Sequence, residues 1–246
     1  SALERVREAA TLHVLTRING TNAARTILEE IKETVVEKRE KLLSYGVTVV
    51  IIGILLSFFQ QAVGINVVLY YAPRIFENLG ASGDVSMRQT VVMGFVNIIF
   101  TLVAIFTVDK FGRKPLLIIG SIGMMIGMAA LSVLSFMDVI GIAALVFIII
   151  YTASFMMSWG PITWVLISEI FPNTIRGQAV AIAVAAQWIA NFLVSSTFPS
   201  LSEWSTGGAY LIYAFFSLLS GIFVYKMVPE TKGKTLEDMT RLWRKK

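Results

Sequence analysis

Long apolar runs constrain this chain more than any other feature. Six stretches are near or above the roughly 20 residues that an α-helix needs to cross about 30 Å of hydrocarbon. We predict them at about 47–72, 89–108, 115–136, 141–166, 178–198 and 209–228. Because 56% of the residues are hydrophobic and only 15% are charged, the chain lacks the polar surface of a soluble protein. The sequence predicts an all-α membrane protein with six transmembrane helices.

Basic residues are distributed unevenly among the connections between these runs. If residues 1–46 are cytoplasmic, all but two of the 21 Lys and Arg residues lie on the cytoplasmic side, the exceptions being Arg74 and Arg88. Basic loops are retained in the cytoplasm, so both ends of the chain are expected there. The same bias explains the basic charge without a nucleic-acid partner.

The runs divide the chain into three segments. Residues 1–46 are polar with apolar residues at helical spacing, which predicts short cytoplasmic amphipathic helices that form a linker. Residues 47–228 hold the six-helix bundle and 229–246 form a cytoplasmic tail. Connections are short, and we expect outer connections at about 73–88, around Asp138 and around Pro199–Gly208. Two groups of three helices with opposite starting sides fit an inverted repeat, a common transporter plan.

Polar side chains inside the spans are almost all neutral. They are Gln60, Gln61, Asn66, Tyr70, Tyr71, Asn97, Ser158, Trp159, Thr163, Trp164, Ser168, Gln187, Trp188 and Asn191. Such residues are costly in a membrane and face a cavity or a neighbouring helix. Amides donate and accept hydrogen bonds together, as sugar hydroxyls do, and aromatic faces suit the C–H face of a sugar ring. The set favours a neutral polyol as cargo, with simple helix–helix adhesion as the alternative.

The spacing of two of these amides predicts a break in the first span. In an unbroken helix Gln61 and Asn66 lie about 140° apart around the axis, so they could not readily share one ligand. A break at Gly64 would re-aim them, and discontinuous helices line many transporter sites.

Four charged residues lie near the cytoplasmic ends of spans: Asp109, Arg113, Glu169 and Arg176. The pair Phe171-Pro172 should end a helix between the last two. Salt bridges among the four could close the inner face in one state and separate in another. The alternative for each residue alone is an ordinary loop charge.

Several kinds of chemistry are missing from the sequence. There are no cysteines, no cluster of metal-binding side chains, no phosphate-binding glycine loop and no nucleophile–base pair, so we expect neither an enzyme nor a metal or other cofactor. No span carries Asp or Glu near its middle, although proton coupling needs a group that titrates within the membrane.

Several motifs resemble those of the sugar porter family of the major facilitator superfamily. They are Gln60–Asn66 (QQAVGIN) with Tyr70–Pro73 (YYAP), Asp109–Lys114 (DKFGRK), Gly160–Trp164 (GPITW) with Ser168–Pro172 (SEIFP) and Arg176-Gly177, and Pro229–Gly233 (PETKG). Together they are specific and cover about 47–246. The stretch 181–191 (AIAVAAQWIAN) is closest to bacterial pentose–proton symporters.

This resemblance implies a role for particular residues. It implies that Gln60, Gln61, Asn66, Asn97, Trp164 and Gln187 bind sugar hydroxyls or stack on the ring, and that Tyr70 and Trp188 line the cavity. It also implies that Arg113, Glu169 and Arg176 belong to the inner-face charge network. The implied cargo is a pentose or hexose, with D-xylose favoured, carried across the cytoplasmic (inner) membrane by alternating access with proton symport.

Members of this family have twelve helices, so the chain corresponds to their carboxyl-terminal half. The resemblance places the proton-carrying acid and the remaining sugar ligands in an amino-terminal six-helix half. A facilitative uniporter, a sugar sensor and a truncated, non-transporting fragment remain as alternatives.

Overall fold

The computed structural model describes residues 2–21, 23–28, 41–78, 82–138, 141–234 and 236–244. The chain forms two compact units, Ser1–Lys41 and Leu42–Lys246. The first contains α1 (Ala2–Asn19). The second contains α3 (Val47–Ala62), α4 (Ile65–Tyr70), α5 (Ala72–Asn78), α6 (Gly83–Phe111), α7 (Arg113–Phe136), α8 (Ile142–Met156), α9 (Trp159–Ile170), α10 (Arg176–Trp204), α11 (Thr206–Met227) and α12 (Leu236–Arg244). The described residues form no strand.

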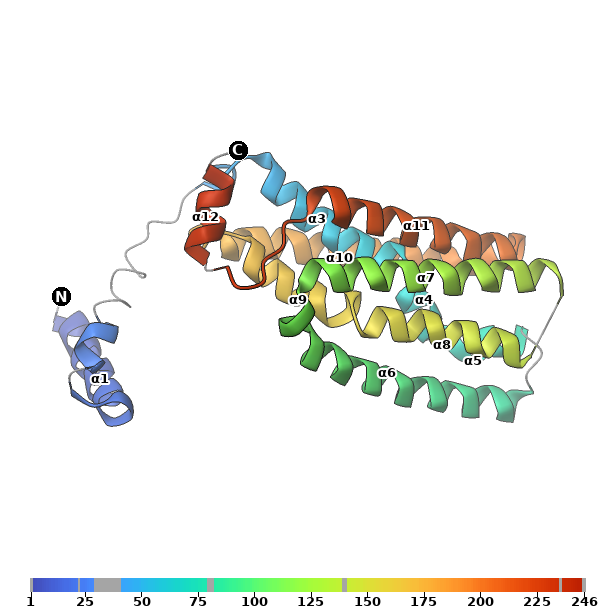
Figure 1. The fold of residues 1–246 in the computed structure, drawn as a ribbon, viewed down its shortest axis with the longest axis horizontal. Helices are drawn as coiled ribbons and strands as arrows, with labels where there is room; N and C mark the ends of the chain where they lie inside the picture. The colour runs from blue at the N-terminus through green and yellow to red at the C-terminus, as the bar shows by residue number, and fades with distance from the viewer. Residues whose placement is uncertain are drawn as a thin grey trace. The chain divides into compact units, whose positions relative to one another are not determined.

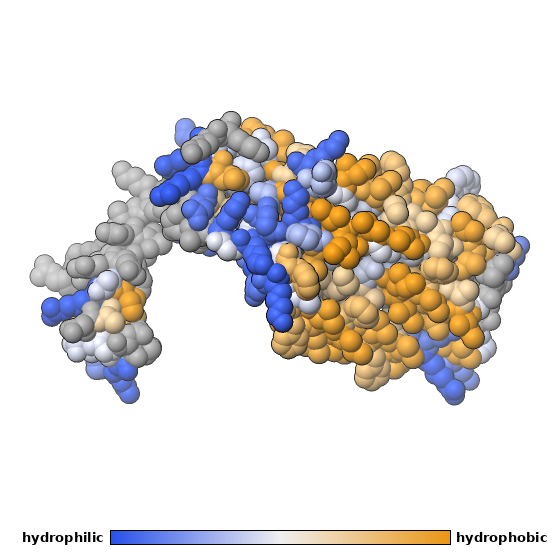
Figure 2. Space-filling model, in the orientation of Figure 1, coloured by the Kyte–Doolittle hydropathy of each residue, from blue (hydrophilic) through white to orange (hydrophobic). Residues whose placement is uncertain are grey.

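Six helical segments of the second unit are long and apolar enough to cross a membrane, as predicted. They are Val47–Tyr70, Gly83–Phe111, Arg113–Phe136, Ile142–Ile170, Arg176–Trp204 and Thr206–Met227. The segments run side by side in one bundle (Figure 1). On the face of the bundle seen in Figure 2, apolar side chains cover most of the surface, and hydrophilic residues gather toward the ends.

The first span is interrupted at Gly64, where the sequence predicted a break. Gly64 has φ 90°, a conformation that glycine adopts without strain because it lacks a Cβ atom. A Cβ atom there would also lie 2.8 Å from the ring of Tyr213. The backbone carbonyl of Val63 accepts a hydrogen bond from the Tyr151 hydroxyl at 2.8 Å. The break is therefore fixed by backbone conformation, by packing and by a hydrogen bond from α8.

The fourth span is also interrupted, and the sequence did not predict this break. Helix α8 ends at Met156 and α9 begins at Trp159. The buried indole of Trp159 donates to the Ser121 hydroxyl at 2.8 Å and to the Leu117 carbonyl at 3.2 Å, both on α7. These bonds attach the start of α9 to α7.

Three glycines on α7 allow α8 and α9 to approach closely. They are Gly120, Gly123 and Gly127. A Cβ atom at these positions would overlap Ser158, Ser154 or Tyr151, respectively. Small residues at such spacing are a common means of close helix packing in membranes, and here they allow α8 and the break that follows it to pack closely against α7.

Helix α10 corrects one sequence prediction. The sequence predicted an outer loop at Pro199–Gly208. This prediction is wrong, because α10 continues through Pro199 and only Ser205 separates it from α11. Proline removes one backbone donor, which would have bonded the Ser195 carbonyl. The hydroxyl of Tyr71 donates to that carbonyl at 3.4 Å. A neighbouring helix thus replaces the lost bond, as transmembrane helices with proline require.

Helix α12 packs against the end of α9. Trp243 is buried, and its indole donates to the backbone carbonyl of Ile170 at 2.9 Å. That carbonyl lies at the end of α9, directly before Phe171-Pro172, where the helix stops as expected. The residues after the last span are therefore attached to the bundle by a buried aromatic anchor.

Candidate functional site

A cavity of about 310 Å³ lies between α3, α4, α8, α9 and α10. This volume is at the small end of the range for ligand sites, roughly 300–1,000 Å³. The cavity is lined by Gln60, Gln61, Ile65, Asn66, Leu69, Tyr70, Phe155, Met156, Gly160, Trp164, Gln187, Trp188 and Asn191. Both interrupted spans contribute to it, since α3 and α4 meet on one side and α8 and α9 on another.

Seven of the eight side chains selected from the sequence line this one cavity: Gln60, Gln61, Asn66, Tyr70, Trp164, Gln187 and Trp188. The break at Gly64 brings two of them together. Asn66 on α4 donates through Nδ2 to Oε1 of Gln61 on α3 at 2.6 Å. The same Nδ2 donates to Oδ1 of Asn191 on α10 at 3.1 Å.

Gln60 is the centre of the amide network. Its Oε1 accepts from Nε2 of Gln187 at 2.5 Å and from Nε2 of Gln61 at 3.3 Å. Its own Nε2 donates to the backbone carbonyls of Trp159 and Gly160, at 3.1 and 3.3 Å. Gln60 therefore connects α3 to α10 and to the first turn of α9, where the fourth span is broken.

One buried acceptor in the network has no partner. Oε1 of Gln187 is buried and has no hydrogen bond within the described part of the chain. A buried polar atom without a partner is costly and calls for an explanation such as a water or a ligand. Gln187 lines the cavity, so a rotation of its amide would offer this oxygen to a hydroxyl donor bound there.

Aromatic side chains form the open margin of the cavity. Trp188 is 63% exposed, Tyr70 59% and Trp164 46%, so this part of the site is accessible from the surface. Among the lining residues only the Tyr70 phenol is ionisable. The arrangement combines neutral donors and acceptors with aromatic faces, which suits a small uncharged polar ligand.

Asn97 is the predicted site residue that the cavity does not include. It lies on α6, and its Oδ1 is buried without a hydrogen-bond partner among the described residues.

Asn191 lines the cavity but was not selected for the site, although the sequence identified it as a polar residue of a span. Its spacing of four residues from Gln187 places both on one helix face, so the signal was available. The apolar wall of Phe155 and Met156 had no comparable signal.

Three of the four predicted inner-face charges are joined in the structure. Arg113 binds Glu169 through two hydrogen bonds, Nη2 to Oε1 at 2.9 Å and Nε to Oε2 at 3.1 Å. It also pairs with Asp109 at 2.9 Å, and Thr231 donates to Oε2 of Glu169 at 2.6 Å. Arg176 is not part of this group: its Nε and Nη2 are buried and have no partner among the described residues.

These features define a class of protein. Six apolar helices, two of them broken beside a cavity of neutral polar and aromatic side chains, are the plan of a membrane transport protein. The sequence shows the family. The protein-family model described as "Sugar (and other) transporter" matches residues 2–243, so the chain belongs to this family. The prediction of a transport protein rather than an enzyme is therefore confirmed.

Named relatives agree with this assignment. The chain is 52% identical over 240 residues to the D-xylose-proton symporter of Escherichia coli (strain K12), covering 94% of this chain and 49% of that protein. It is 42% identical over 249 residues to the glucose facilitated diffusion protein of Zymomonas mobilis, covering 97% of this chain and 53% of that protein. The chain thus spans about half the length of these relatives.

Solved structures confirm the fold. The structure of the proton:xylose symporter XylE with bound 6-bromo-6-deoxy-D-glucose matches with a TM-score of 0.82 at 51% identity, over 94% of this chain and 51% of that one. The inward-open conformation of the E. coli xylose transporter XylE matches with a TM-score of 0.77 at 50% identity, over 94% of this chain and 49% of that one. The fold is that of a six-helix half of a major facilitator superfamily transporter, as the sequence predicted.

Proposed function

We propose that this chain is the carboxyl-terminal half of a sugar carrier that moves a pentose or hexose, with D-xylose favoured, by alternating access. The observation that supports this most directly is the cavity in which seven neutral side chains selected from the sequence meet. The symporter of E. coli transports D-xylose by its name and is 52% identical to the chain. Proton symport in the complete carrier is part of the proposal.

The amides would bind sugar by exchanging their mutual hydrogen bonds for bonds to hydroxyls. A hydroxyl can donate to the unpartnered Oε1 of Gln187 and accept from an amide nitrogen of Gln61 or Asn66, because it offers both functions. Trp164 and Trp188 provide ring faces for the apolar C–H surface of the sugar. Asn97 belongs to the proposed ligand set from the family resemblance alone.

The inner-face charges are proposed to hold the bundle closed at one end. The bidentate pair of Arg113 with Glu169 joins α7 to the carboxyl-terminal end of α9, the helix that follows the break in the fourth span. If α9 moves during transport, this pair must separate or move with it. Arg176 has buried, unpartnered nitrogens and is proposed to join the network when the amino-terminal half is present.

The amino-terminal half is the proposed partner of this chain. The relatives are about twice as long as the part that the chain matches, and α6 is the least buried span, with 11% of its apolar window covered. A second half would cover exposed apolar surface, close the open side of the cavity and supply the acid that carries the proton. The described residues that line the cavity include no Asp or Glu.

The proposed location is the cytoplasmic (inner) membrane, with both termini of this chain in the cytoplasm. The distribution of Lys and Arg supports this orientation, since the connections Asp109–Lys114 and Glu169–Gly177 and the residues after α11 would all lie inside. The proposed division is a linker of residues 1–46, the bundle at 47–228 and the tail at 229–246.

The test is counterflow of labelled D-xylose in liposomes. The chain is reconstituted alone and together with the amino-terminal half of the E. coli symporter as a separate polypeptide. We expect exchange when both halves are present, and its loss when Gln60 and Gln61 are both changed to Ala. Gln178→Ala, which removes an exposed amide outside the cavity, is the matched control. Equal exchange by the Gln60/Gln61 double variant and the control would refute the site.

The same liposomes separate symport from facilitated diffusion, which the Zymomonas mobilis relative performs by its name. Symport predicts that an inward proton gradient drives D-xylose accumulation above the external concentration. Equilibration without accumulation would identify a uniporter.

A further inference from the structure

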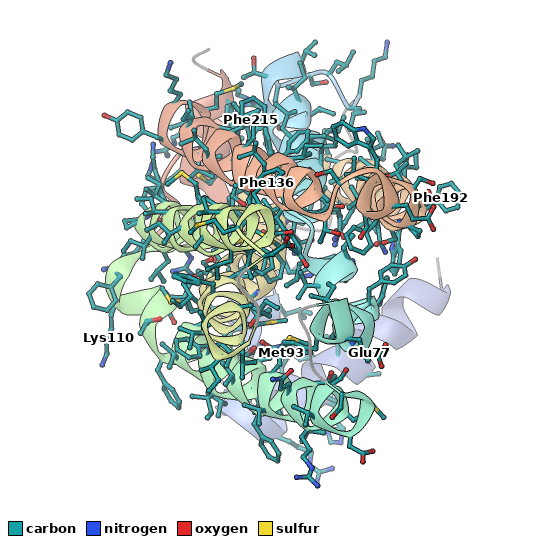
Figure 3. All side chains as sticks on the ribbon, turned by 90° about the vertical axis from the view of Figure 1, so that its right-hand side faces the viewer. Glu77, Met93, Lys110, Phe136, Phe192 and Phe215 are labelled. Carbon is teal, nitrogen blue, oxygen red and sulfur yellow. The ribbon has the colours of Figure 1, made fainter. Side chains whose placement is uncertain are left out.

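Four lysines gather at the end of the bundle where α6 ends, α7 begins and α11 ends. They are Lys110, Lys114, Lys226 and Lys232. The described part of the chain offers none of them a carboxylate partner within salt-bridge distance. Figure 3 shows Lys110 at the margin of the bundle, pointing away from it. The cluster therefore carries four positive charges that no described side chain neutralises.

Three carboxylates in the segments that carry these lysines or contact them are already engaged. Glu230 accepts from four backbone N–H groups, those of Arg113, Lys114, Thr231 and Lys232, at 2.9–3.0 Å. Asp109 and Glu169 pair with Arg113. Backbone amides and the arginine thus occupy these three carboxylates.

The first turn of α7 directs its two basic residues to different partners. Arg113 bonds to Glu169 on α9, whereas Lys114 lies over the ring of Tyr225 on α11, 5.8 Å from its centroid. Consecutive helix residues lie about 100° apart. Lys114 is consequently held on the outer seam between α7 and α11, beside the exposed Tyr225 and Lys226.

A backbone contact places the remaining pair of lysines together. Nζ of Lys232 donates to the backbone carbonyl of Lys110 at 2.6 Å, so its charge lies at the end of α6. The two lysines are both exposed. They extend the basic cluster from the α7–α11 seam across the turn at Gly112.

The surface next to the cluster is apolar. Ile122 on α7 and Leu218 and Ile222 on α11 are exposed, and the last two lie within one or two turns of Tyr225 on the same helix. Figure 2 shows hydrophilic residues at this end of the bundle beside apolar surface that covers the spans. Charge at the membrane boundary next to an apolar seam matches a phospholipid, whose phosphate would lie at the lysines and whose acyl chains would follow the helices.

We propose that this cluster, with Tyr225, binds the headgroup of an anionic phospholipid in the leaflet at this end of the bundle. A lysine ammonium binds phosphate as a compact point charge, and clusters of basic residues beside a span attract anionic lipids. A tyrosine at headgroup level anchors the same boundary. The site faces the bilayer, so it does not depend on the sugar cavity or on its ligand.

Native mass spectrometry of the chain purified in detergent tests the proposal, with phosphatidylglycerol and phosphatidylcholine of identical acyl chains as probes. We expect bound phosphatidylglycerol and much weaker phosphatidylcholine. Each lysine changed to Gln should lower the affinity for phosphatidylglycerol about fivefold, so Lys114→Gln combined with Lys226→Gln should lower it about 25-fold. Lys114→Arg should retain most of the binding, which separates charge from local folding.

The matched control is Arg88→Gln, because Arg88 is an exposed basic residue at the opposite end of α6. It should leave the affinity unchanged. Equal phosphatidylglycerol binding by the Lys114/Lys226 double variant and the native chain overturns the proposal, as does equal binding of the two lipids. A third outcome would also overturn the proposal: if millimolar inorganic phosphate displaces the lipid and the two phospholipids bind equally, the cluster is a site for free phosphate instead.

Discussion

The side-chain nitrogen Nε2 of Gln187 lies 2.5 Å from Oε1 of Gln60, and this bond joins α10 to α3 inside the cavity. The other end of the Gln187 amide, Oε1, is buried without a partner among the described residues. Gln60 in turn holds the first turn of α9 through two backbone carbonyls. The amide oxygen of Gln187 is therefore free to accept a hydrogen bond, whereas both the oxygen and the nitrogen of the Gln60 amide are already bonded.

This difference predicts the effect of Gln187→Leu. The change removes a buried acceptor that is open to a ligand, together with the Nε2 donor that bonds Gln60, and a lost hydrogen bond in a buried site costs about 1–3 kcal/mol. We expect D-xylose affinity to fall by about five- to 150-fold, measured by calorimetric titration of the chain combined with its amino-terminal half. The unfolding temperature should also fall, because the buried bond from Nε2 of Gln187 to Oε1 of Gln60 is lost, although Gln60 keeps its bonds to α9.

Gln178→Leu is the control for that prediction, since Gln178 is exposed and does not line the cavity. Its D-xylose affinity should equal that of the native chain. An unaltered affinity in Gln187→Leu would show that Gln187 only holds helices together.

Gly64→Ala tests the break in the first span. The backbone there has φ 90° and a Cβ atom would lie 2.8 Å from the Tyr213 ring. Left-handed backbone at a non-glycine residue costs of order 1–3 kcal/mol, and the overlap with the ring adds to it. We expect a lower thermal unfolding midpoint in detergent, and also weaker sugar binding, because Asn66 loses its alignment with Gln61.

The control for this change is Gly94→Ala on α6. No atom lies within 4 Å of a Cβ atom at that position, and its backbone is helical. Alanine there should leave the midpoint unchanged or raise it. Similar midpoints for the two variants would mean that the bundle accommodates a regular helix at Gly64.

Arg113→Gln should weaken the inner face more than Asp109→Asn. The Arg113 side chain is 12% exposed and Glu169 30%, whereas Asp109 is 79% exposed. Loss of the bidentate pair should destabilise the chain by about 1–3 kcal/mol after allowance for partial solvent exposure. Loss of the Asp109 pair should cost below about 0.5 kcal/mol.

Chemical denaturation of both variants measures this difference. Asp109→Asn should also lose its small effect at high salt, because an exposed pair is screened. The prediction is wrong if the two variants lose the same free energy of unfolding.

The sequence predicted much of the fold and of the site for identifiable physical reasons. Hydrocarbon thickness sets the length of an apolar run, so the six spans were visible without any knowledge of packing. Neutral amides recur across several spans, so Gln60, Gln61 and Gln187 could be selected as members of a set, and the family resemblance supplied their predicted roles. Gly64 could be predicted as a break, because Gln61 and Asn66 make sense as partners only if the helix is interrupted.

Features that depend on contacts between distant helices were not predictable. The continuation of α10 through Pro199 depends on the Tyr71 hydroxyl reaching the Ser195 carbonyl, 124 residues away in sequence. The break before Trp159 depends on hydrogen bonds to Ser121 and Leu117 of α7. Asn97 is absent from the cavity lining because no residue of α6 contributes to it, and an apolar run does not specify which spans border a cavity.

Tyr151→Phe tests a contact of this second kind. Tyr151 is fully buried, and its hydroxyl donates at 2.8 Å to the Val63 carbonyl beside the break in the first span. Phenylalanine keeps the ring and its packing against Gly127 but leaves the carbonyl without this donor, which costs about 1–3 kcal/mol. The free energy of unfolding should fall by that amount, whereas Tyr225→Phe, at an exposed ring, should change it by less than about 0.5 kcal/mol.

The sugar affinity of Tyr151→Phe should fall less than that of Gly64→Ala, because Gly64 still supplies the backbone conformation that aligns Asn66 with Gln61. Equal unfolding free energies for Tyr151→Phe and Tyr225→Phe would mean that the Val63 carbonyl finds another donor at the break.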